Sequence, residues 1–186
     1  LNKIIGIGIS TGIEEANLAD IENLYRQQGE PVRIELSTLA LADNGRRLTE
    51  RGYRLLGFEN VLGINLQRVL THECEGLSIE RISASRMATW SNTIVTGFSH
   101  PDETGVVVDS FTKDIIAQAI TDVGRAPEYD RYLASIDGQI AGGASMCLAG
   151  EIALLTGATT LAPYRRRGVQ GELLRRRFRQ AQGGGA

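Results

Sequence analysis

Apolar positions in the second part of the chain repeat first at strand spacing and then at helical spacing. Residues 77–82 predict a strand, and between residues 87 and 98 apolar side chains return every three or four positions. Trp90 lies on that apolar stripe, so we interpret it as a core residue, with a place in the wall of a groove as the alternative. A second helix is expected before Gly124, with Asp109 or Ser110 as its cap.

Three strands are predicted next, in a row. Residues 129–136 and 139–148 flank Asp137-Gly138, a strong signal for a two-residue hairpin turn. The dipeptide at 149–150 permits another tight turn into an apolar strand over residues 152–160. The sequence therefore predicts a strand, two helices and an antiparallel three-stranded meander.

The first part of the chain predicts strand, helix, strand, helix, strand. We expect strands over residues 1–10, 32–36 and 54–67, and helices over residues 14–28 and within 39–53. The glycines at positions 6, 8 and 12 do not have the spacing of a dinucleotide-binding loop. We interpret them as strand and turn residues.

Composition indicates a globular cytoplasmic protein. The chain has 186 residues, of which 42% are hydrophobic and 23% charged, and no apolar run reaches the ~20 residues of a membrane helix. The two cysteines, Cys74 and Cys147, have no secretory context and no metal-type spacing. We therefore expect reduced thiols, no metal and no membrane contact.

Positive charge is concentrated near the C-terminus. Seven arginines against Glu172 give residues 165–186 a charge of +6, and the chain total of −2 leaves −8 for the residues before 165. A nucleic-acid surface would be basic over a longer stretch. The charge pattern therefore favours one anionic cofactor, with nucleic acid as a minor alternative.

That basic segment follows the last predicted strand. Pro163 forces the chain out of the strand, residues 165–171 read Arg-Arg-Arg-Gly-Val-Gln-Gly, and an amphipathic helix is predicted from Val169 onward. Unpaired N–H groups, the positive end of the helix dipole and nearby guanidinium groups all favour a polyanion at such a turn. The alternative is a solvated basic helix after an ordinary glycine turn.

The turn resembles the acetyl-CoA motif of the GNAT N-acetyltransferase superfamily, Q/R-x-x-G-x-G/A. Arg165 and Gly168 match, whereas Gln170 takes the final position of the pattern and Gly171 follows it. The resemblance implies acetyl-CoA as co-substrate, with pyrophosphate on the backbone amides of the turn and pantetheine beside the strand end. The implied cofactor-binding residues are Thr160, Leu161, Arg165, Arg166, Arg167, Gly168, Val169, Gln170 and Gly171.

The resemblance covers residues 77–182 and also implies a fold. It is the α/β (α+β) acyl-CoA N-acyltransferase fold, a mixed and mostly antiparallel sheet with flanking helices, which we expect to be incomplete at both ends. Residues 77–186 resemble the N-terminal half of a GNAT domain. By element order and Gly52-Tyr53, residues 1–76 resemble the C-terminal half of a degenerate first GNAT module, with an unrelated α/β cap as the alternative.

The activity implied is transfer of acetyl from acetyl-CoA to an amine by direct attack. The acceptor is an amine of a small molecule, a protein N-terminus or a lysine, and the acidic segment before Arg165 favours cationic or neutral amines. Catalytic residues are unknown, because residues 152–160 contain no carboxylate and Glu151 comes too early. A catalytically inert CoA-binding or regulatory module and a basic-helix interaction module are the alternatives. A bare strand edge would favour association, with a homodimer as one outcome.

Overall fold

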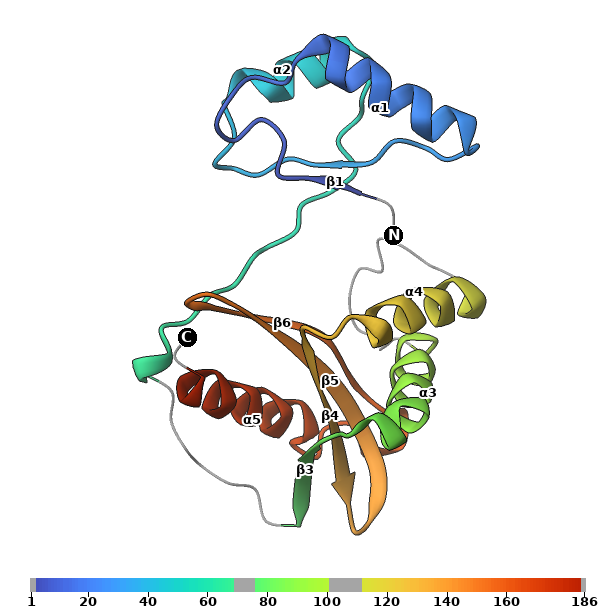
Figure 1. The fold of residues 1–186 in the computed structure, drawn as a ribbon, viewed down its shortest axis with the longest axis vertical. Coiled ribbons are helices and arrows are strands. Elements are labelled where there is room, and N and C mark those ends of the chain that lie inside the picture. The colour runs from blue at the N-terminus through green and yellow to red at the C-terminus, as the bar shows by residue number, and fades with distance from the viewer. Residues whose placement is uncertain (1–2, 69–75, 101–111, 185–186) are drawn as a thin grey trace. The chain divides into compact units, whose positions relative to one another are not determined.

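A computed structural model of the chain describes residues 3–68, 76–100 and 112–184. The chain divides into two compact units, residues 1–59 and residues 60–186 (Figure 1). Each unit has its own elements and its own apolar core.

The second unit is built on a four-stranded antiparallel sheet of order β3-β4-β5-β6. Its strands are β3 (Leu77–Arg81), β4 (Tyr129–Ile136), β5 (Gln139–Ala149) and β6 (Ile152–Thr160). The β4–β5 turn holds Asp137 at φ 50° and Gly138 at φ 76°, the two left-handed residues of a type I′ hairpin. The predicted meander is confirmed, and β6 is an edge strand among the described residues.

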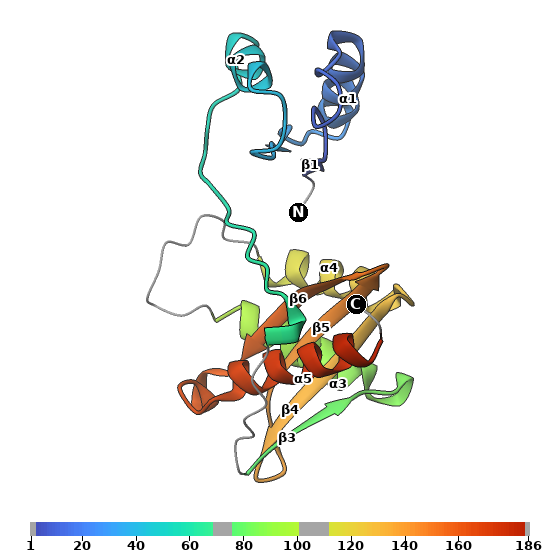
Figure 2. The same cartoon turned by 90° about the vertical axis from the view of Figure 1, so that its left-hand side faces the viewer.

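Helices cover both faces of this sheet. Helices α3 (Met87–Phe98) and α4 (Lys113–Arg125) lie on one face, and α5 (Val169–Gly183) lies on the other. Figure 2 shows α5 in front of the sheet and α3 behind it. Two buried clusters fill the layers, one around Trp90, Ile94 and Leu133 under α3, the other around Tyr132, Met146 and Leu173 under α5. Trp90 is fully buried, as the apolar stripe predicts.

The first unit is small and is held together by polar as well as apolar contacts. It contains β1 (Ile4–Ile5) paired in parallel with β2 (Ile34–Glu35), and helices α1 (Glu15–Gln27) and α2 (Asp43–Glu50). Ile13, Leu18 and Leu48 form its buried core. The short helix η1 (Leu66–Arg68) belongs to the second unit.

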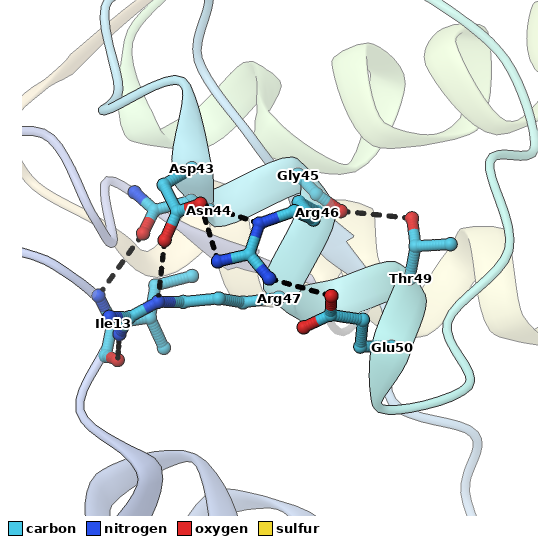
Figure 3. A network of polar contacts seen from close by, with 8 residues as sticks. All are labelled: Ile13, Asp43, Asn44, Gly45, Arg46, Arg47, Thr49 and Glu50. Carbon is cyan, nitrogen blue, oxygen red and sulfur yellow. Dashed lines mark hydrogen bonds and ion pairs between the residues drawn. The ribbon is translucent and has the colours of Figure 1, made fainter.

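A buried asparagine ties α2 to the loop after β1. Asn44 is 1% exposed, donates through Nδ2 to the Gly8 carbonyl at 2.9 Å and accepts from the Ile13 N–H at 3.2 Å. Gly8 has φ 74°, and a Cβ there would lie 2.2 Å from Asn44 Nδ2. Figure 3 shows Asn44 pointing to Ile13 while Arg46 and Arg47 both reach Asp43 on the outside of α2.

Two predicted strands are wrong. Residues 1–10 are expected to form one strand, but within residues 3–10 only Ile4–Ile5 pairs, because Gly6 and Gly8 adopt left-handed conformations that end the strand. The expected strand over residues 54–67 has no described partner strand, so residues 54–65 form no regular element. The large apolar side chains of residues 54–65 are exposed to solvent, and Phe58 is 85% exposed.

The start of α4 also differs from its expected position. This helix begins at Lys113 after Thr112, whereas the predicted caps Asp109 and Ser110 lie outside the described residues.

The interpretation of residues 1–76 and 77–186 as halves of two GNAT modules stays a prediction. The α+β class with flanking helices is confirmed by the sheet and its helices.

Candidate functional site

The chain leaves β6 through a tight turn and enters α5 with a glycine at the helix start. A single 3-10 turn, η3 (Ala162–Tyr164), follows β6, and Pro163 lies within it. Gly168 is the residue before α5 and has φ 81°, a conformation that glycine adopts without steric cost. Arg166 has φ 61°, which is rare for a residue with a side chain and is typical of strained functional sites.

This geometry leaves a row of backbone donors at the N-terminus of α5. The first i→i−4 hydrogen bond of the helix runs from the Glu172 N–H to the Gly168 carbonyl at 3.0 Å, so the preceding N–H groups have no intrahelical acceptor. The carboxylate of Glu172 does not compete for them, because it is 8% exposed and binds Arg175 Nη2 at 2.9 Å. The turn is therefore suited to an anion.

An open cleft of about 450 Å³ lies between the end of β6, the end of α3 and this turn, and we call it the β6–α5 cleft. Most of the predicted cofactor-binding residues line it, namely Thr160, Arg165, Arg166, Gly168, Val169, Gln170 and Gly171. Leu161 and Arg167 are not among its lining residues, and their predicted role stays a prediction. The cleft also includes residues that the sequence interpretation missed, namely Gly97, Phe98, Ala158 and Thr159.

The arginines of the turn have different surroundings. Arg165 donates through Nε to the Thr160 carbonyl at 3.4 Å and through Nη2 to the His100 carbonyl, so it links the end of β6 to the segment after α3. Arg167 lies with its guanidinium 5.8 Å from the Tyr164 ring and 4.0 Å from Asp137. Arg165 and Arg166 therefore supply the positive charge of the cleft, whereas Arg167 faces the β4–β5 turn.

Close contact between α3 and β6 forms one wall of the cleft. A Cβ at Gly97 would lie 2.0 Å from Thr159 Oγ1, so only glycine lets the helix approach the strand this closely. Thr159 is 8% exposed, and the buried Oγ1 of its neighbour Thr160 has no hydrogen-bond partner among the described residues. The sequence signal was the glycine within a helical pattern, which can mark tight packing.

A bulge interrupts the β5–β6 ladder beside the cleft. Gly143 pairs with Thr159 but Ser145 pairs with Thr156, so β6 has one more residue than β5 between these pairs. Gly157 lies in the extra stretch with φ 56°. The Ala144 carbonyl opposite the bulge accepts from Trp90 Nε1 at 3.0 Å.

The described residues that line the β6–α5 cleft include no Asp, Glu, His, Cys or Tyr. The described part of the chain also holds no cluster of three or more His, Cys, Asp or Glu side chains suited to a metal. Within the same residues, no helix has the length and apolar character needed to cross a membrane. Among the described residues, the groups that the cleft presents to a ligand are therefore backbone N–H groups and arginine side chains.

The first unit has a cleft of its own, of about 700 Å³, around Glu22, Arg51 and Tyr53. Arg51 Nε binds Glu22 Oε1 at 2.7 Å, and Tyr53 Oη donates to the same oxygen at 3.0 Å. The hydrogen bond from Arg51 lowers the pKa of Glu22, and burial together with Glu22 raises the pKa of Tyr53 to about 12. Glu22, Arg51 and Tyr53 therefore satisfy one another and are less available to a ligand than the backbone N–H groups at the start of α5.

No protein-family model and no curated protein matches the sequence. Solved structures do match, and the chain has the fold of the GNAT N-acetyltransferases. The GCN5-related N-acetyltransferase from Kribbella flavida is similar to 97% of this chain with a TM-score of 0.70 and 16% identity. This chain covers 66% of that protein.

A second similar structure is a conserved protein of unknown function from Staphylococcus epidermidis ATCC 12228. It matches 91% of this chain with a TM-score of 0.56 and 13% identity, and 68% of its own length is covered. At these identities the likeness concerns the fold. The expected acyl-CoA N-acyltransferase architecture is therefore confirmed.

Proposed function

We propose that the β6–α5 cleft binds acetyl-CoA and that the protein is a GNAT-type N-acetyltransferase. The observation that carries the proposal is the N-terminus of α5 after Gly168, where the first N–H groups have no intrahelical acceptor. It follows β6, which is an edge strand among the described residues, and it lies beside Arg165 and Arg166. Such a turn offers amides and positive charge to a pyrophosphate. The GNAT fold supports the same cofactor.

The cleft fits the rest of the cofactor as well. The edge strand β6 leaves the backbone groups on its outer side without a ladder partner among the described residues, and an extended amide chain such as pantetheine can pair with them. Ala158, Thr159 and Thr160 would lie along that chain, and the bulge at Gly157 would lie beyond it, toward the thioester. Acetyl-CoA supplies an activated acetyl thioester when bound.

The contribution of the protein to the reaction is then positioning and backbone polarisation. Holding the thioester close to an amine replaces a bimolecular encounter by an effectively unimolecular one. Backbone N–H groups near the bulge would stabilise the oxyanion formed by amine attack, before the CoA thiolate leaves. We propose a small-molecule amine, a protein N-terminus or a lysine as acceptor, and a cytoplasmic location.

One observation favours a second candidate, a catalytically inert CoA-binding or regulatory module. No acid or base side chain lines the described cleft, so removal of the amine proton has no assigned group. An enzyme of this kind would use water or a group outside the described residues. Binding of acetyl-CoA without amine-dependent release of CoA would favour the inert module.

The proposal is tested by calorimetry with acetyl-CoA and by thiol release in the presence of a panel of amines. Gly168→Val should weaken binding more than Arg176→Ala, because valine is strained by ~1–2 kcal/mol or more at a left-handed position. Arg176 serves as the control, since it does not line the cleft. No heat of binding at millimolar acetyl-CoA would refute the proposal, and equal losses in the two variants would refute the pyrophosphate assignment.

A further inference from the structure

Arg177 is a buried arginine that has no carboxylate partner among the described residues. It is 2% exposed, its hydrogen bonds to described residues go to backbone carbonyls, and Tyr132 is near enough to interact with it electrostatically. Its Nε donates to the Leu173 carbonyl at 3.1 Å, and its Nη1 donates to the Ser145 carbonyl at 3.1 Å and the Thr156 carbonyl at 3.5 Å. Burial lowers its pKa to about 10, which still leaves the guanidinium charged at neutral pH. A residue this costly to bury calls for a specific reason.

The two strand carbonyls that Arg177 contacts flank the β5–β6 bulge. Ser145 and Thr156 form the last regular pair of the ladder before the extra stretch that contains Gly157 and Ala158. Ser145 Oγ also donates to the Thr156 carbonyl at 3.1 Å and lies 2.9 Å from Thr156 Oγ1. Arg177 therefore connects the helix of the anion-binding turn to the point where the two strands separate.

The bulge is held from both faces of the sheet. Trp90 of α3 donates to the Ala144 carbonyl from one face, and Arg177 of α5 donates to the Ser145 and Thr156 carbonyls from the other. Trp90 is fully buried, and Ser145 is 1% exposed. Of the cleft residues, Ala158 belongs to the bulge and Thr159 and Thr160 follow it directly, so the conformation of the bulge sets where their backbone lies.

We infer that Arg177 is a positioning residue: it fixes the β5–β6 bulge and thereby the part of the cleft that receives the pantetheine and thioester end of acetyl-CoA. The inference rests on the proposed function. Arg177 does not line the cleft, so its action on the cofactor passes through the backbone of β6. The nucleotide end of the cofactor, held at the start of α5, does not depend on the bulge.

This division of the cleft gives a selective test by calorimetry. Two ligands are compared, acetyl-CoA and its nucleotide half, adenosine 3′-phosphate 5′-diphosphate, which ends before the pantetheine arm. Arg177→Met should raise the Kd of acetyl-CoA by about tenfold, equivalent to ~1.4 kcal/mol, while the Kd of the nucleotide stays within about twofold. Arg177→Lys, which keeps a charged donor, should recover part of the loss.

Two further variants keep the test decisive. Ser145→Ala removes the other contact on the Thr156 carbonyl and should show the same selective pattern even if Arg177→Met does not fold. Arg179→Met makes the same charge change on α5 outside the cleft lining and should leave both affinities unchanged.

The outcomes separate the two proposals. The positioning role is overturned if Arg177→Met and Ser145→Ala weaken the binding of both ligands equally, or weaken the binding of neither. The proposal that the cleft binds acetyl-CoA would still stand. If the wild-type protein binds neither ligand, the proposed function fails, and the positioning role fails with it.

Discussion

Replacing Gly97 by alanine is a direct test of how α3 packs on β6. The added Cβ would lie 2.0 Å from Oγ1, 2.5 Å from Cγ2 and 2.7 Å from Cβ of Thr159. Thr159 is β-branched and held in a strand, so it cannot move aside without shifting the backbone. Overpacking of this kind costs ~1–3 kcal/mol, and three contacts below 3 Å favour the upper end.

Alanine is also a better helix former than glycine, which offsets about 1 kcal/mol of that cost. The free energy of unfolding is therefore expected to fall by about 2 kcal/mol in Gly97→Ala. Gly124 in α4 is the matched control, because a Cβ there would lie 3.8 Å from Met87 Sδ and 3.9 Å from Trp90 Cζ3, both ordinary contacts. Gly124→Ala should gain up to ~1 kcal/mol, so the two variants should differ by about 3 kcal/mol.

Urea unfolding followed by tryptophan fluorescence measures this difference in the second unit alone. The chain has a single tryptophan, Trp90, which is fully buried under α3. Adding Thr159→Gly to Gly97→Ala removes all three close atoms. The loss in free energy of unfolding of the double variant should therefore be smaller than the sum of the two single losses, by ~0.5–3 kcal/mol. Equal stability of Gly97→Ala and Gly124→Ala would contradict the close contact between Gly97 of α3 and Thr159 of β6.

Two other predictions concern buried polar groups. Asn44→Ala leaves the Gly8 carbonyl and the Ile13 N–H without their partner and should lower the free energy of unfolding of the first unit by ~1–3 kcal/mol. The loss should appear as faster hydrogen exchange of the amides in residues 3–59. Unchanged exchange would contradict the role of Asn44. Burial raises the pKa of Tyr132 from 10 to about 12, so its contribution to stability is complete below pH 10 and is lost as the pH rises toward 12. The Tyr132 hydroxyl has no hydrogen-bond partner among the described residues, so Tyr132→Phe should not lower stability at neutral pH. In unfolding experiments the variant should lose less stability than the wild type as the pH rises toward 12. A variant that keeps the full loss of stability at alkaline pH would refute this prediction.

The second unit could be predicted from the sequence because its signals are local. Asp137-Gly138 specifies the hairpin, and the apolar spacing of residues 87–98 defines α3. The Arg/Gly turn between β6 and α5 lies where the sequence predicts it for the same reason, since a strand, a turn and an amphipathic helix are contiguous in sequence. The fold therefore agrees with the prediction, and seven of the nine residues predicted to bind the cofactor line one cleft, while their role in binding stays a prediction.

What the sequence could not supply depends on contacts distant along the chain. Arg177 belongs to an arginine-rich run that predicts a solvated face, yet its neighbours in space are the carbonyls of two strands, and it is buried. Residues 54–67 have strand-like composition, but a strand also needs a neighbouring strand, and the described residues provide none. Gly97 and Thr159 meet only after the sheet and α3 have packed.

The most direct test of cofactor binding in the β6–α5 cleft is an amide NMR titration of residues 1–186 with CoA. We expect the largest shifts at the amides of Gly168 to Gly171, with smaller shifts at Ala158 to Thr160, because these backbone groups line the cleft. The nucleotide half alone should move the first group and leave the second in place. Shifts centred on Glu22, Arg51 and Tyr53 in the first unit, or no shifts at millimolar CoA, would contradict the assignment.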